Sequence, residues 1–151
     1  MSLTFRTARR DDLPQIVRML ADDILGAGRE VVSDPPAQEY FAAFEAVDKN
    51  PNDFLVVAEL NGDLVGCAQL TILHGLSRKG MKRGHIEAVR VASGHRGGGI
   101  GEALIKELVR LARAADCGLV QLTSSVERDR AVAFYERLGF RVTHKGMKLE
   151  F

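Results

Sequence analysis

Apolar and polar residues follow two different periods along this chain, and these periods predict strands and helices. Alternation at every second position, or a short apolar run, predicts strands over residues 3–8, 54–60, 64–73, 85–91 and 118–123. Apolar residues three and four positions apart predict a first helix that starts within residues 11–14 and ends at residues 26–28, and further helices over residues 38–47, 100–115 and 129–138. The dipeptide Asn61-Gly62 predicts a hairpin turn, and residues 140–151 predict a final hairpin that turns at Lys145-Gly146.

The order of these elements predicts a single α/β domain over residues 1–151. One strand, two helices and a meander of three strands lead into a strand–helix–strand unit, so we expect a mixed sheet with a parallel pair in its second half. No internal repeat, low-complexity tract or linker interrupts the pattern, and 151 residues suffice to bury one hydrophobic core.

The composition of the chain disfavours nucleic acid, membranes and metal ions as binding partners. The 21 Lys and Arg residues balance 20 Asp and Glu residues, so no excess of positive charge favours nucleic acid. The apolar runs fall well short of the roughly 20 residues of a membrane span, so we expect no membrane association. Cys67 and Cys117 lie far apart and match no metal or redox spacing, which favours a reduced, cytoplasmic setting. The four histidines show no metal-ligand spacing either, so we expect no metal site.

Five glycines fall within eight positions, from Gly94 to Gly101, between a predicted strand and a predicted helix. Glycines there leave backbone N–H groups free to face a common ligand, because no Cβ atom stands in the way. The helix N-terminus adds about half a positive charge at the same place. Arg96 supplies a further cationic group beside it. The loop is therefore suited to a phosphate or pyrophosphate, and the alternative is a plain flexible loop.

Two common phosphate-binding motifs are absent. The Walker pattern requires Lys after its last glycine, where this chain has Ile100. The dinucleotide fingerprint fails at Leu104, and the strand that follows does not end with an acidic residue that could bind a ribose. These departures from the two motifs count against nucleoside triphosphates and NAD as ligands of the loop.

A different motif does fit. The loop Arg96-Gly97-Gly98-Gly99-Ile100-Gly101 reads as [Q/R]-x-x-G-x-[G/A], residues 86–91 precede it, and residues 128–140 contain the pattern A-x-x-F-Y-x-x-x-G-F. In this order and at these separations, the three segments resemble the GNAT superfamily of acetyl-coenzyme A-dependent N-acetyltransferases. The resemblance is specific over residues 86–140. It implies a GNAT-like acyl-CoA N-acyltransferase fold, which is a mixed, mostly antiparallel twisted sheet of six to seven strands with helices on both faces and a splayed parallel pair.

The resemblance also implies acetyl-coenzyme A as the co-substrate and assigns residues to it. Backbone groups of Val89 and Val91 would pair with the pantetheine arm as an added strand does. Arg128 stands where many members carry a cofactor-binding Asn, and arginine could reach phosphate or pantetheine oxygens. The implied cofactor-binding residues are Val89, Val91, Arg96, Gly97, Gly98, Gly99, Ile100, Gly101 and Arg128.

Glu87 is the candidate general base. A free amine has a pKa of about 10 and must lose a proton before it can attack a thioester. Glu87 interrupts an apolar strand, and alternation places it on one face with Val89 and Val91. We expect it to act directly or through a water. The alternatives are an ion pair with Arg83 or Arg90, or a place at an exposed strand end.

Tyr135 holds the tyrosine position of the family, which implies a general acid for the departing thiolate. A thiol has a pKa of roughly 8.5, so protonation of the leaving group helps without being essential. The alternative is that Tyr135, like its neighbour Phe134, only packs the last helix against the sheet.

The leading hypothesis is an N-acetyltransferase in which a primary amine attacks acetyl-coenzyme A directly in a ternary complex. The alternative is a non-catalytic acyl-CoA-binding regulatory module. A dinucleotide-dependent oxidoreductase is disfavoured because the dinucleotide-binding fingerprint is absent. A ping-pong route through Cys67 or Cys117 is disfavoured because neither has a neighbouring histidine. The identity of the acceptor stays open between a small-molecule amine and a peptide amine. The oligomeric state also stays open, although family members often form homodimers.

Overall fold

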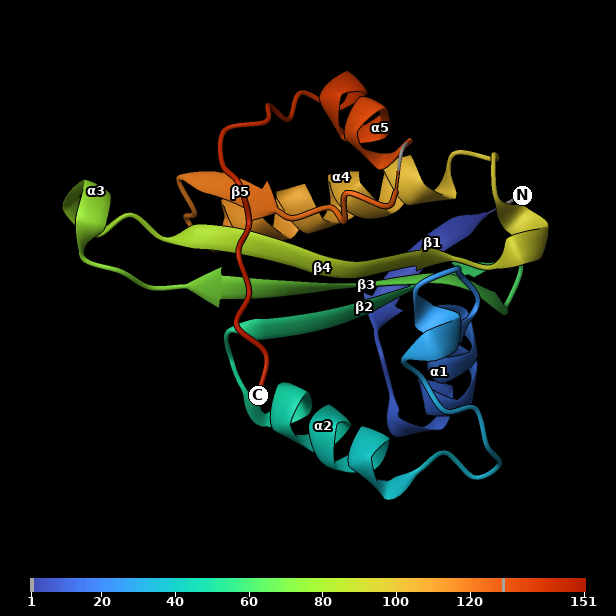
Figure 1. Cartoon of the computed structure of the whole chain (residues 1–151). Coiled ribbons are helices and arrows are strands. Elements are labelled where there is room, and N and C mark those ends of the chain that lie inside the picture. The colour runs from blue at the N-terminus through green and yellow to red at the C-terminus, as the bar shows by residue number, and fades with distance from the viewer. Residues whose placement is uncertain (1, 129) are drawn as a thin grey trace. The chain divides into compact units, whose positions relative to one another are not determined.

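The computed structural model of the chain describes residues 2–128 and 130–151 (Figure 1). The chain forms two compact units, Met1–Gln121 and Leu122–Phe151, and each is described by itself.

The first unit is built on a five-stranded mixed sheet in the order β1-β2-β3-β4-β5. The strands are β1 Leu3–Thr7, β2 Asp53–Leu60, β3 Asp63–Leu73, β4 Arg83–Val91 and β5 Leu119–Leu122. Strands β1 to β4 pair antiparallel. β5 joins the edge of β4, and the Gly118 N–H donates to the Lys82 carbonyl oxygen (2.8 Å) just before both strands begin. The predicted meander and its Asn61-Gly62 turn are confirmed, with φ of 54° and 88° at the two turn residues.

One face of the sheet packs against α4 (Ile100–Ala114), the longest helix. The apolar period predicted from the sequence is confirmed, because Leu104, Leu108 and Ala112 are fully buried. Gly84 of β4 lies so close to this helix that a Cβ atom there would meet the Ala112 Cβ at 3.1 Å. Ile86 and Leu70, which are opposite each other in the β3–β4 register, complete the apolar layer.

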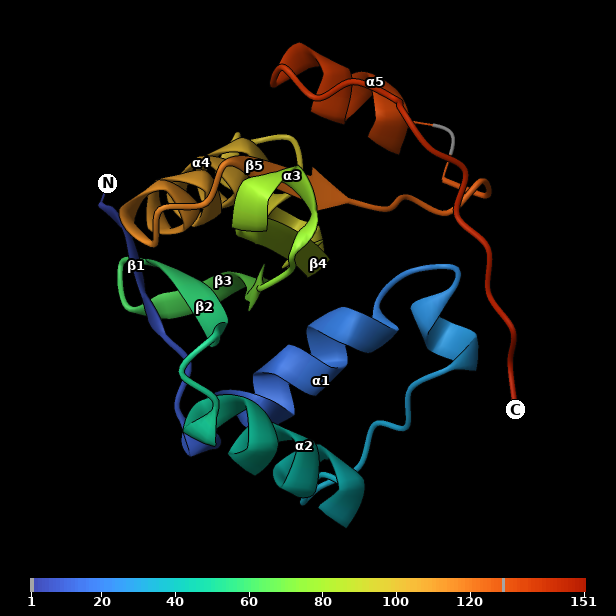
Figure 2. The same ribbon diagram turned by 90° about the vertical axis from the view of Figure 1, so that its left-hand side faces the viewer.

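The other face carries α1 (Leu13–Ala21) and α2 (Gln38–Lys49), so the helices lie on both sides of the sheet (Figures 1 and 2). Their apolar stripes enclose a second cluster with the side chains of the sheet. The members of this cluster are Ala8, Leu13, Ile16, Met19, Phe44, Val57 and Cys67. Short 3-10 turns at Arg10–Asp12 and Gly26–Gly28 flank α1.

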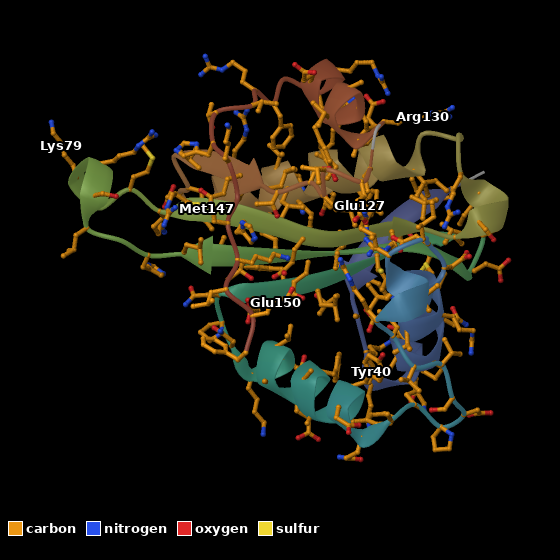
Figure 3. The ribbon with its side chains drawn as sticks, viewed as in Figure 1. Tyr40, Lys79, Glu127, Arg130, Met147 and Glu150 are labelled. Carbon is orange, nitrogen blue, oxygen red and sulfur yellow. The ribbon has the colours of Figure 1, made fainter. Side chains whose placement is uncertain are left out.

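The connection between β3 and β4 extends beyond the sheet and was predicted as a loop. It contains a single turn, α3 (Ser77–Gly80), in which Arg78 and Lys79 have positive φ. Figure 3 shows Lys79 at the tip, pointing away from the strands. The surrounding residues 74–80 are exposed, so this tip contributes nothing to the core.

Within its described residues, the second unit contains one helix, α5 (Ala131–Arg137). The helix predicted over residues 129–138 is therefore present, although position 129 lies outside the described residues. The predicted hairpin over residues 140–151 is wrong, because the described residues there form no strand. Val142, Met147 and Leu149 alternate with polar residues but are exposed, and an alternating segment becomes a strand only when a neighbour pairs with it. The structure thus has five strands among its described residues instead of six to seven.

No helix within the described residues is long and apolar enough to cross a membrane.

Candidate functional site

Strand β4 carries an irregularity that the sequence did not predict. Glu87 lies opposite Gln69 of β3, whereas Arg90 lies opposite Cys67, so β4 has one residue more than β3 across this interval. Ala88 has a φ of 54°, a value that residues other than glycine rarely adopt. The arrangement is a β-bulge, which bends a strand and leaves a residue outside the ladder. Backbone strain of this kind is often found at functional sites.

The bulge changes which side chains share a face. Glu87 lies on the face of α1 and α2, because its partner Gln69 is two residues from the core residue Cys67. Val91 pairs with Gly66, where an added Cβ would meet Leu104 of α4 at 2.9 Å. The expectation that Glu87, Val89 and Val91 share one face is therefore wrong: the extra residue reverses the alternation between Glu87 and Val91.

The glycine loop connects β4 to α4, as the sequence predicts. Gly97 and Gly99 adopt left-handed φ angles of 82° and 84°, and Gly99 is the N-cap residue of α4. A Cβ atom added at either glycine would have no heavy atom within 4 Å, so both face open space. The Ala103 N–H donates to the Gly99 carbonyl oxygen (3.0 Å). The N–H groups at the start of α4 can therefore serve an anion.

The side chain of Arg96 is bound within the protein. Its Nη2 donates to the Asp22 carbonyl oxygen at 2.7 Å, and its Nε donates to the Val91 carbonyl oxygen at 3.2 Å. The Asp22 carboxylate lies 3.5 Å from the same Nη2. Arg96 therefore ties the start of the glycine loop to the C-terminal end of α1.

A second arginine reaches the same end of α1. The Arg90 Nε lies 3.3 Å from the Asp23 Oδ2, and both side chains are largely buried. Two consecutive carboxylates after α1 are thus paired with arginines that flank the end of β4.

Glu87 is exposed on β4. Neither of the two arginines considered as ion-pair partners contacts it: Arg83 donates to Gln121 Oε1 (3.2 Å), and Arg90 is paired with Asp23. No other cationic side chain within residues 2–128 and 130–151 lies within ion-pair distance of Glu87. An exposed carboxylate without such a partner can accept a proton from a ligand.

The surface of the first unit includes two hollows of different size. The smaller, about 400 Å³, is lined by loop residues 94–96, 98 and 100, together with Leu3 and Leu60. The larger, about 780 Å³, lies beside α1 and includes Arg6, Asp12 and Glu59. Glu87 is not among the residues that line either of these two hollows.

Tyr135 and Arg128 belong to the second unit. Tyr135 is half-buried in α5, and its ring makes edge contacts with Phe134 and Phe140 at centroid distances of 5.0 and 5.6 Å. The Arg128 N–H donates to the Ser125 carbonyl oxygen (3.0 Å), and this residue is also half-buried. Tyr135 therefore has a packing role within the second unit, through its contacts with Phe134 and Phe140.

The two cysteines do not present a nucleophile. Cys67 is 1% exposed in the core, and burial raises the pKa of its thiol to about 12. Burial also raises the pKa of the Cys117 thiol, at the end of α4. No cluster of metal-ligating side chains occurs among the described residues.

Two features of the site are not predicted from the sequence: the bulge at Ala88 and the bond from Arg96 to Asp22. Arg96 and Asp22, which this bond joins, are 74 positions apart in the sequence. A positive φ at an alanine has no sequence signature, because alanine has no preference for it.

Comparison with known proteins identifies relatives. The sequence profile of the Acetyltransferase (GNAT) family matches residues 17–140. Glucosamine 6-phosphate N-acetyltransferase of Trypanosoma brucei brucei is 42% identical over 89 residues, which cover 59% of this chain and 58% of that protein. Streptothricin acetyltransferase of Streptomyces lavendulae is 32% identical over 130 residues, which cover 78% of this chain and 66% of that protein. The chain thus spans about three fifths of the length of these curated relatives.

Among solved structures, a protein of Bacillus halodurans C-125 described as a transcriptional regulator is 41% identical, with a TM-score of 0.97. The match covers 99% of this chain and 100% of that one. The profile match extends from α1 through the glycine loop to the end of the A-x-x-F-Y-x-x-x-G-F segment. This chain is a member of the GNAT acetyltransferase family.

Proposed function

We propose that this protein transfers the acetyl group of acetyl-coenzyme A to a primary amine by direct attack in a ternary complex. The observation that carries the proposal is the glycine loop at the start of α4, whose geometry is suited to a pyrophosphate. Family membership supports acetyl-coenzyme A as the donor.

The loop from Arg96 to Gly101 would hold the pyrophosphate of the donor through its backbone N–H groups. The open space beyond the Cβ positions of Gly97 and Gly99 supports this assignment, because a ligand can approach the backbone there. Ile100 and Gly101 open α4 and would add the positive end of its dipole. Arg96 would contribute its N–H while its side chain anchors the loop to Asp22.

The end of β4 would receive the pantetheine arm. Val89 and Val91 follow the bulge at Ala88, where the ladder between β3 and β4 is interrupted. Backbone N–H and C=O groups freed by a bulge can pair with an extended ligand as a strand would. Arg128 would complete the cofactor-binding set in place of the family's Asn.

Glu87 would accept the proton that the acceptor ammonium must lose. Its exposure and its lack of a cationic partner among the described residues support this role. Tyr135 would return a proton to the departing thiolate. In the overall reaction, one ammonium and one thioester give one amide, one thiol and one released proton. Cys67 cannot carry the acetyl group, since its thiol is buried and its pKa is raised.

A small-molecule amine is the proposed acceptor class. Two relatives are named for glucosamine 6-phosphate and streptothricin, which supports a low-molecular-weight acceptor. A panel of amino sugars, polyamines, amino acids and N-terminal peptides, assayed for free thiol release from acetyl-coenzyme A, tests the proposal. We expect thiol release that depends on the amine. If no amine in the panel elicits thiol above the rate of hydrolysis, the proposal fails.

The second candidate is a non-catalytic acyl-CoA-binding regulatory module. The observation that favours it is the similarity to a protein described as a transcriptional regulator. Such a module needs the glycine loop but neither Glu87 nor Tyr135. Stabilisation by acetyl-coenzyme A in a thermal-shift assay, without thiol release for any amine, would favour this candidate.

A further inference from the structure

Residues 141–151 follow α5 and form an extended segment on the surface of the second unit. Every residue of this segment is exposed, and no turn or bend interrupts its course. Figure 2 shows the segment as one drawn-out thread that ends at the C-terminus. Met147, Leu149 and Phe151 are almost completely exposed. They occupy every second position, so their apolar side chains would share one face of a strand.

The end of α5 fixes the point at which this segment leaves the helix. The Phe140 N–H donates to the Tyr135 carbonyl oxygen (3.1 Å), and the Gly139 N–H donates to the Glu136 carbonyl oxygen (3.0 Å). Gly139 has a left-handed φ of 96°, and the Phe140 ring contacts the Tyr135 ring. These contacts form a Schellman motif, which closes a helix with a defined geometry. The segment therefore starts from a fixed residue, Phe140.

Strand β5 offers an edge that can accept another strand. It is the last strand of the sheet, and no strand pairs with its outer edge in the part of the chain that the structure describes. Val120 lies on the α4 face, because a Cβ atom at Gly84 would meet both the Val120 Cγ2 and the Ala112 Cβ. Leu122 shares this face with Val120, and both are only half-buried. An adjoining strand with apolar residues at every second position would extend this apolar layer and pair the open edge.

The occupant of this edge that fits best is a second copy of the chain. Within one chain, the described residues pair neither the segment nor the outer edge of β5. A hairpin over residues 140–151 would need a reversal at Lys145-Gly146, and the backbone does not turn there. A second copy has the same open edge and the same extended segment. Two copies related by a twofold axis can each give one segment and receive one, which closes the assembly at two.

The surface of the segment is large enough for a stable dimer. An extended chain exposes on the order of 160 Å² per residue, so residues 141–151 expose about 1,700 Å². If pairing covers half of each segment, the two segments together lose about 1,700 Å², to which the receiving surfaces add their own share. Stable interfaces bury about 1,600 Å² in total. Lys148 and Glu150 alternate with the apolar residues, so the opposite face of the strand stays polar.

We propose that residues 141–151 pair with the β5 edge of a second copy of this chain, so that two copies form a dimer by reciprocal strand exchange. Met147, Leu149 and Phe151 extend the apolar layer on the α4 face of the partner. The exchange explains why an alternating segment has an extended backbone in a chain that does not pair it. It does not depend on the acetyl-transfer reaction.

The experiment compares the full wild-type chain with Leu149→Lys. Light scattering over a range of concentrations measures the dimer, and hydrogen exchange measures the protection of the backbone amides of residues 119–122. We expect a wild-type dimer in which this protection falls on dilution to the monomer. Leu149→Lys should raise the dissociation constant of the dimer about 100-fold. Because Leu149 is exposed in the single chain, the circular dichroism of this variant should match that of the wild type.

Leu76→Lys is the matched control, because Leu76 is 96% exposed beside α3, outside the segment. It should leave the dissociation constant within about twofold of wild type. A wild-type chain that stays monomeric at every concentration would overturn the proposal. Protection of β5 that does not change on dilution would also overturn it, because the segment would then pair within its own chain. A dimer that Leu149→Lys does not weaken, or that Leu76→Lys weakens equally, would place the interface elsewhere and refute the exchange.

Discussion

The Arg96 guanidinium donates to the backbone carbonyl oxygen of Asp22 at 2.7 Å, across 74 positions of the chain. The bond joins the first residue of the glycine loop to the residue that ends α1. The shape of the loop therefore depends on α1 as well as on its own glycines. The Asp22 carboxylate is more distant, at 3.5 Å, so the backbone oxygen is the main acceptor.

We predict that Arg96→Ala weakens acetyl-coenzyme A binding by about tenfold, or about 1.4 kcal/mol, because the loop loses its anchor. Asp22→Ala should have less than a threefold effect, since the backbone acceptor remains. Isothermal titration with acetyl-coenzyme A measures both. Arg110→Ala is the control, because Arg110 is paired with Glu107 on the exposed side of α4. Equal weakening by the Arg96 and Asp22 substitutions would contradict the anchor.

Gly98→Val tests the proposed pyrophosphate cradle without left-handed strain. Gly98 has no positive φ, and an added Cβ would meet only the His95 carbonyl oxygen, at an ordinary 3.5 Å. We expect the melting temperature without ligand to stay within about 2 °C of wild type, a shift that corresponds to about 0.5–1 kcal/mol at most. The stabilisation by acetyl-coenzyme A should be lost. Gly75→Val, at an exposed position with no atom within 4 Å, should retain that stabilisation. Ligand stabilisation that persists in the Gly98 variant would argue against the cradle.

Glu87→Gln should lower kcat for the amine by about 10²–10⁴-fold, the usual contribution of a general base. The amide cannot take a proton, so the variant should gain activity with rising pH as the free amine itself becomes deprotonated. Measurement of kcat as a function of pH for the wild type and the variant tests this change. Glu127→Gln, an exposed carboxylate of the second unit, serves as the control. A Glu87 variant with the wild-type rate at neutral pH would exclude this residue as the base.

Asp12 should make the stability of the first unit pH-dependent. It is 9% exposed and accepts hydrogen bonds from the Arg6 Nη1 and Nη2 (2.7 and 2.9 Å) and from the Arg9 N–H (2.7 Å). The bonds from Arg6 hold the pKa of Asp12 below its usual value. The folded state therefore binds this proton less readily than the unfolded state, and the stabilisation is full above the unfolded pKa of about 3.9 and is lost as pH falls through the folded value.

We predict that Asp12→Asn lowers the free energy of unfolding at neutral pH by about 2–3 kcal/mol and removes this part of the acid sensitivity. Urea titrations at several pH values measure both effects. Glu45→Gln removes a 3.4 Å ion pair with Arg10 that is more than half exposed, and should cost about 0–1 kcal/mol. A loss from Asp12→Asn no larger than that of the control would refute the prediction.

Cys67→Ala should leave kcat within about twofold of wild type, because direct attack needs no thiol. The Cys67 thiol is 1% exposed, and burial raises its pKa to about 12, so the folded protein should also resist alkylation there. Peptide mass mapping after iodoacetamide treatment, with and without denaturant, measures the second effect. A Cys67→Ala variant that folds but releases no thiol would revive the ping-pong route.

The sequence predicted those elements whose signals are local. The hairpin at Asn61-Gly62 follows from turn chemistry, and the long helix from Ile100 follows from its apolar period. The glycine loop was predicted at its observed place because a run of glycines before a helix has few structural uses. In each case the determining residues are neighbours in the chain.

Features that depend on distant residues were not predicted. Alanine at position 88 adopts a φ of 54° because the pairing of β3 with β4 requires it, so alternation assigned Glu87 and Val91 to the same face. The alternation over residues 140–151 has the pattern of a strand, but pairing depends on a neighbouring edge that the pattern does not supply.

The most direct measurement follows the acetyl group itself. The wild-type protein is incubated with acetyl-coenzyme A labelled with ¹³C in the acetyl carbonyl and with each amine of the panel, and products are identified by mass spectrometry and NMR. The account predicts that at least one amine becomes a labelled amide, with one free thiol released for each amide formed. Stabilisation of the protein by acetyl-coenzyme A with no labelled amide from any amine would contradict it.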